Sequence, residues 1–229
     1  MSTVTEVVEP TGMRGTRARD ARRAEELGDI ASLAARKRGR LFGEMLVFAI
    51  LSLIAAAALS IEAIALAKNP NASSYCSINA ILDCSKVGST WQANVFGFPN
   101  AFLGLVSEPV VMTIAVASLA GVRFPRWFMF TANVCYLLGV IFAYWLLYQS
   151  TFVIGALCPW CLLVTVSTTF VFTSMTQWNI LEGNLFLSPR ADARAVALVS
   201  KGWFAVGLIA WFAILVIMEL LKWGHRLFL

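Results

Sequence analysis

Long apolar stretches separated by short polar connections run through most of the chain. A helix that crosses a bilayer needs about 20 mainly apolar residues, and five stretches reach this length. Tryptophan residues lie near several of their ends, where the amphipathic indole prefers the membrane interface. The pattern therefore predicts an all-α integral membrane protein with five transmembrane helices, over residues 41–67, 101–122, 127–148, 152–178 and 203–222.

The composition supports this prediction. Hydrophobic residues make up 59% and charged residues 14% of the 229 residues, whereas soluble domains average about 45–50% and 25%. A water-soluble enzyme and a disordered chain are therefore excluded as descriptions of the whole protein. The net charge of +5 forms no basic stripe on a predicted folded face, so we expect contact with membrane lipid and no binding of nucleic acid.

The basic residues predict the orientation in the membrane. Nine of the 18 Lys and Arg residues precede residue 41, and others occupy the connections after the second and fourth spans. These three segments lie on one side of the membrane, which the positive-inside rule assigns to the cytoplasm. The predicted order is a flexible cytoplasmic head (1–40) with a short interfacial helix near residues 31–35, a four-helix bundle (41–178) with an extracytoplasmic loop (68–100), a cytoplasmic loop (179–202), and a fifth helix with a short tail (203–229).

The cysteines are the main candidates for chemistry, because the chain has one histidine and no phosphate-binding loop, zinc-protease motif or serine triad. Cys76 and Cys84 lie in the predicted outward loop, and Cys158 and Cys161 open the fourth span on the same side. Disulfides persist on that side of the membrane. Cys135 lies in the middle of the third span, where we expect a small apolar residue in a helix interface.

The sequence Cys158-Pro159-Trp160-Cys161 favours redox chemistry. Residues i and i+3 share a helix face, so the two sulfurs can form a disulfide. The N-terminus of a helix stabilises the thiolate, which is the attacking form, and proline is well tolerated in the first turn. Two dithiols on one face of the membrane can exchange electrons through a mixed disulfide.

Two structural alternatives remain for these four cysteines. They could form inert disulfides that staple the outward loop. Four thiolates also suit tetrahedral zinc, but structural zinc sites usually separate paired ligands by about two to four residues. Because seven residues separate Cys76 from Cys84, we expect no metal.

Ionisable residues accompany the cysteines. Glu62 and Glu108 lie in predicted spans and are candidate functional residues, because charged groups are costly within a bilayer. Each lies near the outer half of its span, so a snorkelling or water-exposed position is an equal alternative. Asp83 should raise the pKa of Cys84 while Lys86 opposes it, and the sequence leaves this balance open.

Three motifs occur in order along the chain: Cys76-x7-Cys84-Ser85-Lys86-Val87-x-Ser89-Thr90, Gly97-Phe98-Pro99-Asn100-x-x-x-Gly104 and Cys158-Pro159-Trp160-Cys161. Together they resemble the bacterial branch of the vitamin K epoxide reductase (VKOR) family, over residues 41–178. The resemblance implies four transmembrane helices around a quinone, capped by the extracytoplasmic loop.

The resemblance also implies a role for each cysteine of the two pairs. Cys161 matches the cysteine nearest the quinone, and Cys158 matches its disulfide partner. Cys84 matches the loop cysteine that exchanges with Cys158. Cys76 matches the cysteine that meets the redox partner.

Four further residues are expected near the quinone. Asn100 and Thr90 match positions that neighbour it, and Ser89 is the alternative to Thr90 because the alignment is uncertain by one residue there. Phe98 is expected to cover the ring or, alternatively, to belong to the interfacial aromatic belt. The structural alternative for Asn100 is a helix N-cap after Pro99.

The implied function is that of a membrane thiol–disulfide oxidoreductase in a bacterial inner (plasma) membrane. It re-oxidises a thioredoxin-like or DsbA-like partner, passes the electrons to a quinone and supports disulfide formation in secreted proteins. Many bacterial relatives carry a fused thioredoxin-like domain, but this chain stops at Leu229, so we expect a separate partner. Menaquinone is favoured over ubiquinone.

Two alternative functions differ from this one. Thr165 stands where the animal enzymes have a tyrosine linked to vitamin K chemistry, which disfavours a vitamin K epoxide reductase proper. A non-enzymatic membrane scaffold with a disulfide-stapled loop is the other alternative.

Overall fold

The computed structural model describes residues 11–69, 76–77 and 81–227 of the chain. Within these ranges the regular structure is helical, and one isolated β-bridge joins Leu82 to Leu157. The helices are α1 (Thr11–Lys68), α2 (Cys84–Gly88), the 3₁₀-helix η1 (Trp91–Asn94), α3 (Ala101–Leu119), α4 (Arg126–Tyr148), the π-helix η2 (Gln149–Ile154), α5 (Pro159–Leu181), α6 (Pro189–Ser200) and α7 (Trp203–Leu227).

The prediction of an all-α protein with five transmembrane helices is confirmed, because five helices of the described chain are long and apolar enough to cross a membrane. The predicted start of the fourth span at residue 152 is wrong. Residues Gln149–Ile154 continue α4 as a π-helix, and Gly155 then takes a left-handed conformation with φ of +68°. Glycine tolerates this conformation, so the chain turns there and α5 begins at Pro159.

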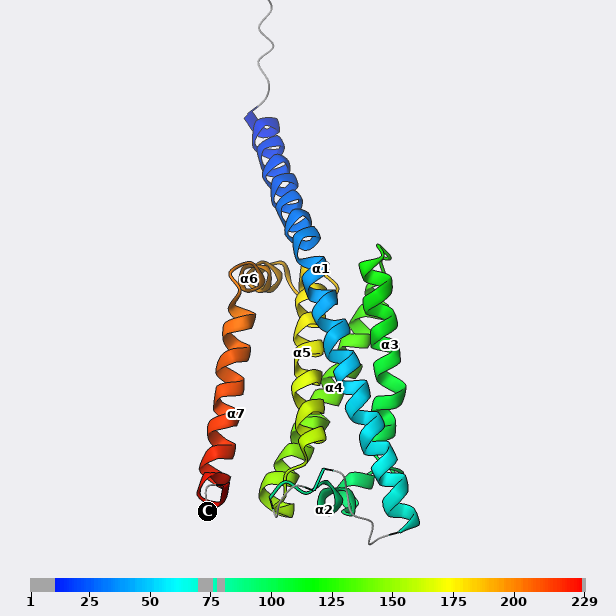
Figure 1. Ribbon diagram of the computed structural model, residues 1–229. Coiled ribbons are helices and arrows are strands. Elements are labelled where there is room, and N and C mark those ends of the chain that lie inside the picture. The colour runs from blue at the N-terminus through cyan, green and yellow to red at the C-terminus, as the bar shows by residue number, and fades with distance from the viewer. Residues whose placement is uncertain (1–10, 70–75, 78–80, 228–229) are drawn as a thin grey trace, which may run out of the picture.

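Helix α1 is much longer than its predicted span and projects beyond the bundle (Figure 1). The sequence predicts a flexible head with a separate short helix, whereas residues 11–40 are continuous with the membrane span. The reason is that this segment contains no proline, and that Ala and Arg, which favour helix, make up 14 of its 30 residues. Residues 1–10 of the predicted head lie outside the described chain.

Helices α1, α3, α4 and α5 form the bundle (Figure 1). Helix α1 packs against both α3 and α5, and α4 packs against α5. Phe42, Met45 and Met175 are fully buried in its main core. Gly104 allows α1 and α3 to approach closely, since a Cβ at this position would lie 2.7 Å from the Cβ of Ala56.

Helices α6 and α7 complete the described chain. Helix α6 lies across one end of the bundle, within the predicted loop 179–202, and leads into α7, which runs along the bundle's edge (Figure 1). Trp211 of α7 donates a hydrogen bond from Nε1 to the Tyr144 hydroxyl, at 2.7 Å. Thr151 donates to Glu219 of α7, also at 2.7 Å.

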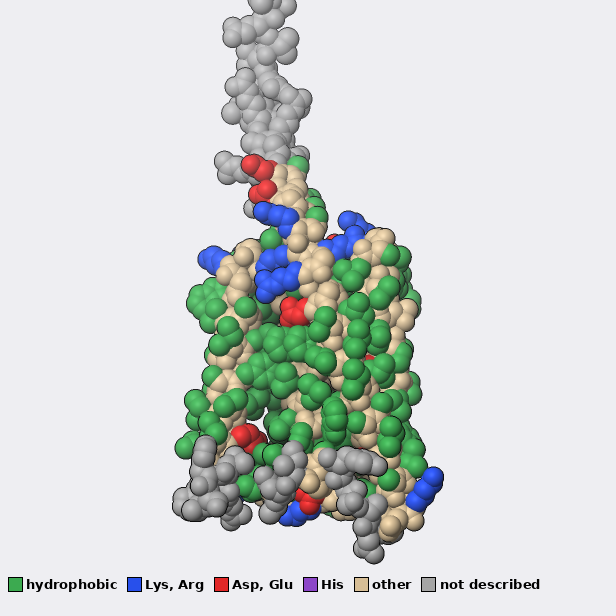
Figure 2. Space-filling view, viewed as in Figure 1, with side chains coloured by type: hydrophobic (Ala, Val, Ile, Leu, Met, Phe, Trp, Pro, Cys, Tyr) green, Lys and Arg blue, Asp and Glu red, His purple; other side chains and the backbone are tan. Residues whose placement is uncertain are grey.

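The two ends of the bundle differ in character. Apolar side chains cover its sides, and Lys and Arg gather at the end where α6 lies (Figure 2). The opposite end is capped by α2, η1 and their connections (Figure 1). This cap is tied to the segment before α5, because Asp83 N donates to Leu157 O at 3.0 Å and Leu157 N donates to Ile81 O at 2.7 Å.

Candidate redox site

The cap brings the four predicted redox cysteines together. Cys76 and Cys84 form a disulfide, with their Cα atoms 5.7 Å apart. The Cys84 and Cys158 sulfurs lie 3.1 Å apart, and Cys161 follows one helical turn later. Cys76, Cys84 and Cys158 are all buried. We call these four residues the sulfur cluster.

Two helix starts and one bridge position the sulfur cluster. Cys84 is the first residue of α2, and Cys158 occupies the N-cap position of α5. The bridge between Leu82 and Leu157 brings the two segments together, with Cys158 directly after Leu157 and Cys84 two residues after Leu82. Residues 74 apart in the sequence thereby come into sulfur contact.

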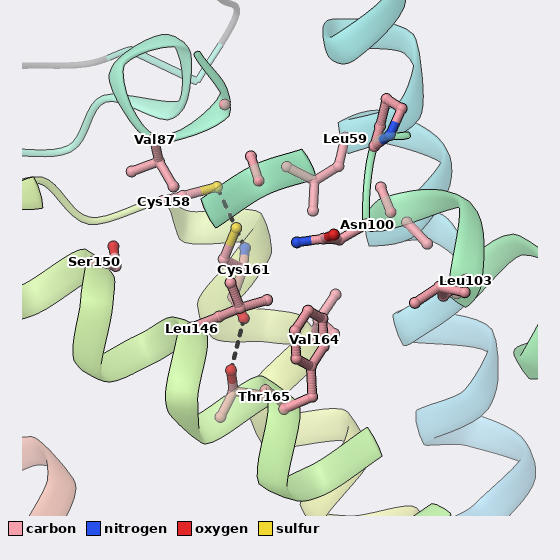
Figure 3. A pocket seen from close by; sticks show the side chains of 18 of the residues that line it. Leu59, Val87, Asn100, Leu103, Leu146, Ser150, Cys158, Cys161, Val164 and Thr165 are labelled. Carbon is pink, nitrogen blue, oxygen red and sulfur yellow. Dashed lines mark hydrogen bonds between the residues drawn. The ribbon is translucent and has the colours of Figure 1, made fainter. Parts of the chain in front are cut away.

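Cys158 lies where a thiolate is stabilised. Its Sγ accepts a hydrogen bond from the backbone N–H of Cys161 at 3.4 Å (Figure 3). A hydrogen bond with the Cys161 side chain lowers the pKa of the Cys158 thiol, and the backbone N–H groups of Cys161 and Trp160 add to this effect against the opposing effect of burial. A thiol with a lowered pKa is a larger fraction thiolate at neutral pH and therefore reacts more readily.

Asp83 caps the helix that carries Cys84. Its Oδ1 accepts hydrogen bonds from the backbone N–H groups of Ser85 and Lys86, at 3.0 and 3.2 Å. Burial raises the pKa of Asp83, but hydrogen bonds from the Ser77 and Ser85 side chains and from these N–H groups outweigh it and lower the pKa. Because Cys84 is in a disulfide, the predicted competition between Asp83 and Lys86 over its pKa does not arise in this state.

Three sulfurs of the cluster lie as closely as metal ligands. The Sγ atoms of Cys76, Cys84 and Cys158 are within 4.8 Å of one another. Two of them share a disulfide bond, whereas zinc is bound by thiolates. The described geometry therefore favours thiol–disulfide exchange over metal binding.

A cavity of about 310 Å³ extends from the sulfur cluster into the bundle. Its wall includes Cys84, Cys158 and Cys161 and is otherwise mostly apolar. Figure 3 shows four of the apolar residues that surround it, which are Leu59, Leu103, Leu146 and Val164. A cavity of this size, with few polar groups in an apolar wall, suits a small ring-containing ligand such as a quinone head group.

Asn100 is the predicted quinone neighbour that the structure brings to the cavity. Its side chain points toward Cys158 and Cys161 in Figure 3. It occupies the N-cap position of α3 but makes no capping hydrogen bond. Instead, Nδ2 donates to Gln92 O at 2.6 Å and Oδ1 accepts from Val95 N at 3.2 Å. An amide nitrogen carries two N–H donors, so one remains for a ligand.

The other three predicted quinone neighbours are not part of the cavity wall. The Thr90 hydroxyl donates to Val87 O at 2.7 Å, and the Ser89 hydroxyl donates to Lys86 O at 3.1 Å. Phe98 is 40% exposed and stacks with neighbouring phenylalanines. The Ser89 and Thr90 hydroxyls therefore bond to backbone carbonyl groups at the end of α2.

The cavity wall also contains a hydrogen-bonded group of three side chains around Glu108, which the sequence does not reveal as a group. Glu108 is only 4% exposed, so the snorkelling or water-exposed alternative for this residue is wrong. Ser52 and Tyr136 donate hydrogen bonds to it. The isolated glutamate in an apolar span was a usable signal, but no sequence pattern links residues of three different helices.

Cys135 and Glu62, which the sequence singled out within spans, both line the cavity. Cys135 is exposed and lies in the cavity wall, so its predicted packing in a helix interface is wrong. The Cys76 sulfur lies 3.6 Å from both carboxylate oxygens of Glu62, which also lines the cavity. A carboxylate therefore accompanies the loop disulfide.

A bundle of membrane-spanning helices with paired cysteines beside an apolar cavity is typical of a membrane redox protein. The profile of the Vitamin K epoxide reductase family matches residues 44–176, which is more than half of the chain. The chain therefore belongs to this family and is a membrane redox enzyme. The matched region contains the sulfur cluster and the cavity, whereas α6 and α7 lie outside it.

Membership of the family indicates the general chemistry of the site. Its members are generally linked to quinones and work with thioredoxin-like partners. A comparison with curated proteins finds no significant match.

Proposed function

We propose that the protein re-oxidises a separate thioredoxin-like or DsbA-like partner and passes the electrons to a quinone, and that it thereby supports disulfide formation in secreted proteins. The observation that carries this proposal is the continuity of the sulfur cluster with the cavity. The loop disulfide contacts Cys158, and the cavity wall includes Cys158 and Cys161.

The exchange begins at the loop disulfide. A thiolate of the reduced partner attacks Cys76, the Cys76–Cys84 bond breaks, and Cys84 leaves as a thiolate. Cys84 attacks Cys158 in a Cys158–Cys161 disulfide and releases Cys161. The second partner thiolate then frees Cys76, which attacks Cys84 and releases Cys158. The net result is one new disulfide in the partner and one reduced Cys158–Cys161 pair.

The geometry supports the step between the two pairs. The Cys84 and Cys158 sulfurs are 3.1 Å apart, within the range of about 3–3.5 Å for atoms poised to react. A loop disulfide together with free Cys158 and Cys161 is the arrangement that this mechanism expects after electrons enter the second pair. The lowered pKa of Cys158 also makes it a good leaving group in this exchange.

The cavity residues have the chemistry to hold a quinone. The apolar wall would enclose the ring, and the remaining Asn100 N–H would donate to a carbonyl oxygen, where negative charge grows on reduction. A quinone bound there supplies a two-electron acceptor. We favour menaquinone over ubiquinone as the native quinone.

The proposal also includes the location. We place the protein in a bacterial inner membrane, with the sulfur cluster on the extracytoplasmic side. The basic end of the bundle supports this orientation (Figure 2), because Lys and Arg favour the cytoplasmic side. Disulfide formation also requires the oxidising side of the membrane.

The residue at position 165, which could distinguish epoxide reduction from quinone reduction, does not support epoxide reduction. The Thr165 hydroxyl donates to Cys161 O in its own helix, at 3.0 Å. It supplies no phenol to the cavity at this position. Quinone reduction does not require one.

Quinone reduction by the purified protein, pre-reduced and held in detergent, tests the proposal. Soluble menaquinone and ubiquinone analogues would be compared, and quinol formation would be followed by absorbance. Cys161→Ala should abolish quinol formation, whereas Cys135→Ala, which alters another thiol in the cavity wall, should retain it. The proposal fails if the parent protein reduces neither analogue or if Cys161→Ala is as active as the parent.

A further inference from the structure

Glu108 lies in the membrane-spanning part of α3 and is buried in the cavity wall. The Ser52 hydroxyl, from α1, donates to its Oε1 at 2.9 Å. The Tyr136 hydroxyl, from α4, lies 3.0 and 3.1 Å from its two carboxylate oxygens. All three side chains line the cavity. We call these residues the Glu108 triad.

Burial of Glu108 within the membrane-spanning part of the bundle costs free energy, which suggests that the residue has a function. An ionisable side chain within a bilayer is expensive, and such groups commonly mark proton or substrate sites. Among the described residues, the hydrogen-bond partners of Glu108 are neutral, and no Lys or Arg forms an ion pair with it. A hydroxyl can both donate and accept a hydrogen bond, so the two partners suit both the carboxylic acid and the carboxylate.

The position of the triad complements that of Asn100. Glu108 lies eight positions after Asn100, the N-cap of α3, which corresponds to a rise of about 12 Å along the helix. Asn100 points toward Cys158 and Cys161 (Figure 3), and the Glu108 triad lines the same cavity about two helical turns further along α3. A quinone carries its two carbonyl oxygens on opposite edges of the ring. The Cys158 and Cys161 thiols can supply a proton near the first oxygen, so the second oxygen needs a donor elsewhere in the cavity wall.

We infer that Glu108 supplies the proton to the carbonyl oxygen that points away from the sulfur cluster. This inference rests on the proposed quinone reduction. When the Cys158–Cys161 bond forms, two electrons pass from the sulfurs to the quinone, one thiol proton passes to the near oxygen, and the other is released to water. The Glu108 carboxyl gives its proton to the far oxygen and becomes a carboxylate, which Ser52 and Tyr136 stabilise by donating hydrogen bonds. After the quinol leaves, water that enters the cavity returns a proton to Glu108.

Glu108→Gln is the direct test, because it retains the shape and removes the acidic proton. Glu44→Gln is the matched control, since Glu44 is a half-buried glutamate of α1 that does not line the cavity. Single-turnover oxidation of the reduced protein by a soluble quinone analogue gives the rate. A general acid contributes about 10²–10⁴-fold to a rate, so Glu108→Gln should be at least about 100-fold slower, whereas Glu44→Gln should match the parent. Equal rates for the two variants would overturn the inference.

Infrared difference spectroscopy provides a readout that does not depend on turnover. Adding the quinone analogue to the oxidised protein should shift a carboxyl C=O band in the parent and in Glu44→Gln, and this signal should be absent from Glu108→Gln. If no carboxyl band responds to the quinone, Glu108 does not contact it and the inference fails.

Two further comparisons separate the possible causes of failure. If the parent itself reduces no quinone, the proposed function fails first; the infrared signal then still reports on the contact. If Glu108→Gln does not fold, Tyr136→Phe retains the carboxyl and removes one of its partners. This variant should react more slowly than the parent, and an unchanged rate would contradict the inference.

Discussion

The contact between α1 and α3 at Gly104 can be tested with a single added methyl group. A Cβ at Gly104 would lie 2.7 Å from the Cβ of Ala56, closer than side-chain carbons approach in folded proteins. Gly139 lines the same cavity, but a Cβ there meets nothing within 4 Å. Gly104→Ala and Gly139→Ala therefore change the same residue type in the same cavity wall, with and without a clash.

The expected magnitude follows from the difference between the two variants. Both gain about 0.8–1.0 kcal/mol of helix propensity when glycine becomes alanine. Only Gly104→Ala also incurs the overpacking cost of about 1–3 kcal/mol. Since 1 kcal/mol shifts Tm by about 2–4 °C in a chain of 150–250 residues, the Tm of Gly104→Ala should be about 2–12 °C lower than that of Gly139→Ala.

Thermal unfolding in detergent, followed by tryptophan fluorescence, measures this difference directly. The comparison between variants removes the effects of detergent and of the helix propensity that both share. Equal Tm values, or a lower Tm for Gly139→Ala, would refute the close packing of α1 on α3 and the shape of the cavity that depends on it.

Three further predictions concern the cap and the cavity. Asn100→Ala removes the hydrogen-bond donor proposed for the quinone. Because one hydrogen bond contributes about 0.5–1.5 kcal/mol, the affinity for a quinone, measured by fluorescence quenching, should fall about 2–12-fold. Unchanged affinity would exclude Asn100 from the site. Asp83→Ala removes the cap of α2 and should cost about 1 kcal/mol at neutral pH. The folded-state pKa of Asp83 is lowered, so its contribution is present above the unfolded pKa and is lost as pH falls through the folded value; the Tm difference between parent and Asp83→Ala should shrink in acid, and a difference independent of pH would contradict the charged cap. Because the Cys161 side chain lowers the pKa of Cys158, the ultraviolet thiolate absorbance of Cys158 should appear at higher pH in Cys161→Ala than in the parent, and an identical titration would show that Cys161 has no such effect.

Much of the fold could be predicted from the sequence because membrane spans depend on local hydropathy. The span bounds at residues 101 and 148 agree with the start of α3 and the end of α4. The turn at Gly155 was visible as a glycine before the Cys158-Pro159-Trp160-Cys161 motif. The π-helix before it could not be predicted, because its last three residues, Phe152, Val153 and Ile154, are apolar and are equally compatible with the start of the next span.

The site could be predicted only in part, for a related reason. The cysteines stand out because each pair is close in sequence and few other reactive residues are present. The Glu108 triad depends on how α1, α3 and α4 pack, and its members are separated by 28 residues or more. Likewise, Ser89 and Thr90 have hydroxyl groups that suit a ligand, but they bond to the backbone of α2 instead.

The most direct test of the central claim is the stoichiometry of coupled oxidation. A reduced thioredoxin-like protein, a quinone analogue and the purified protein in detergent would be combined, and partner disulfide and quinol would be measured in the same sample. The account predicts one quinol for each partner disulfide, and loss of both products in Cys161→Ala. Partner disulfides formed without quinol, or quinol formed by Cys161→Ala at the parent rate, would contradict it.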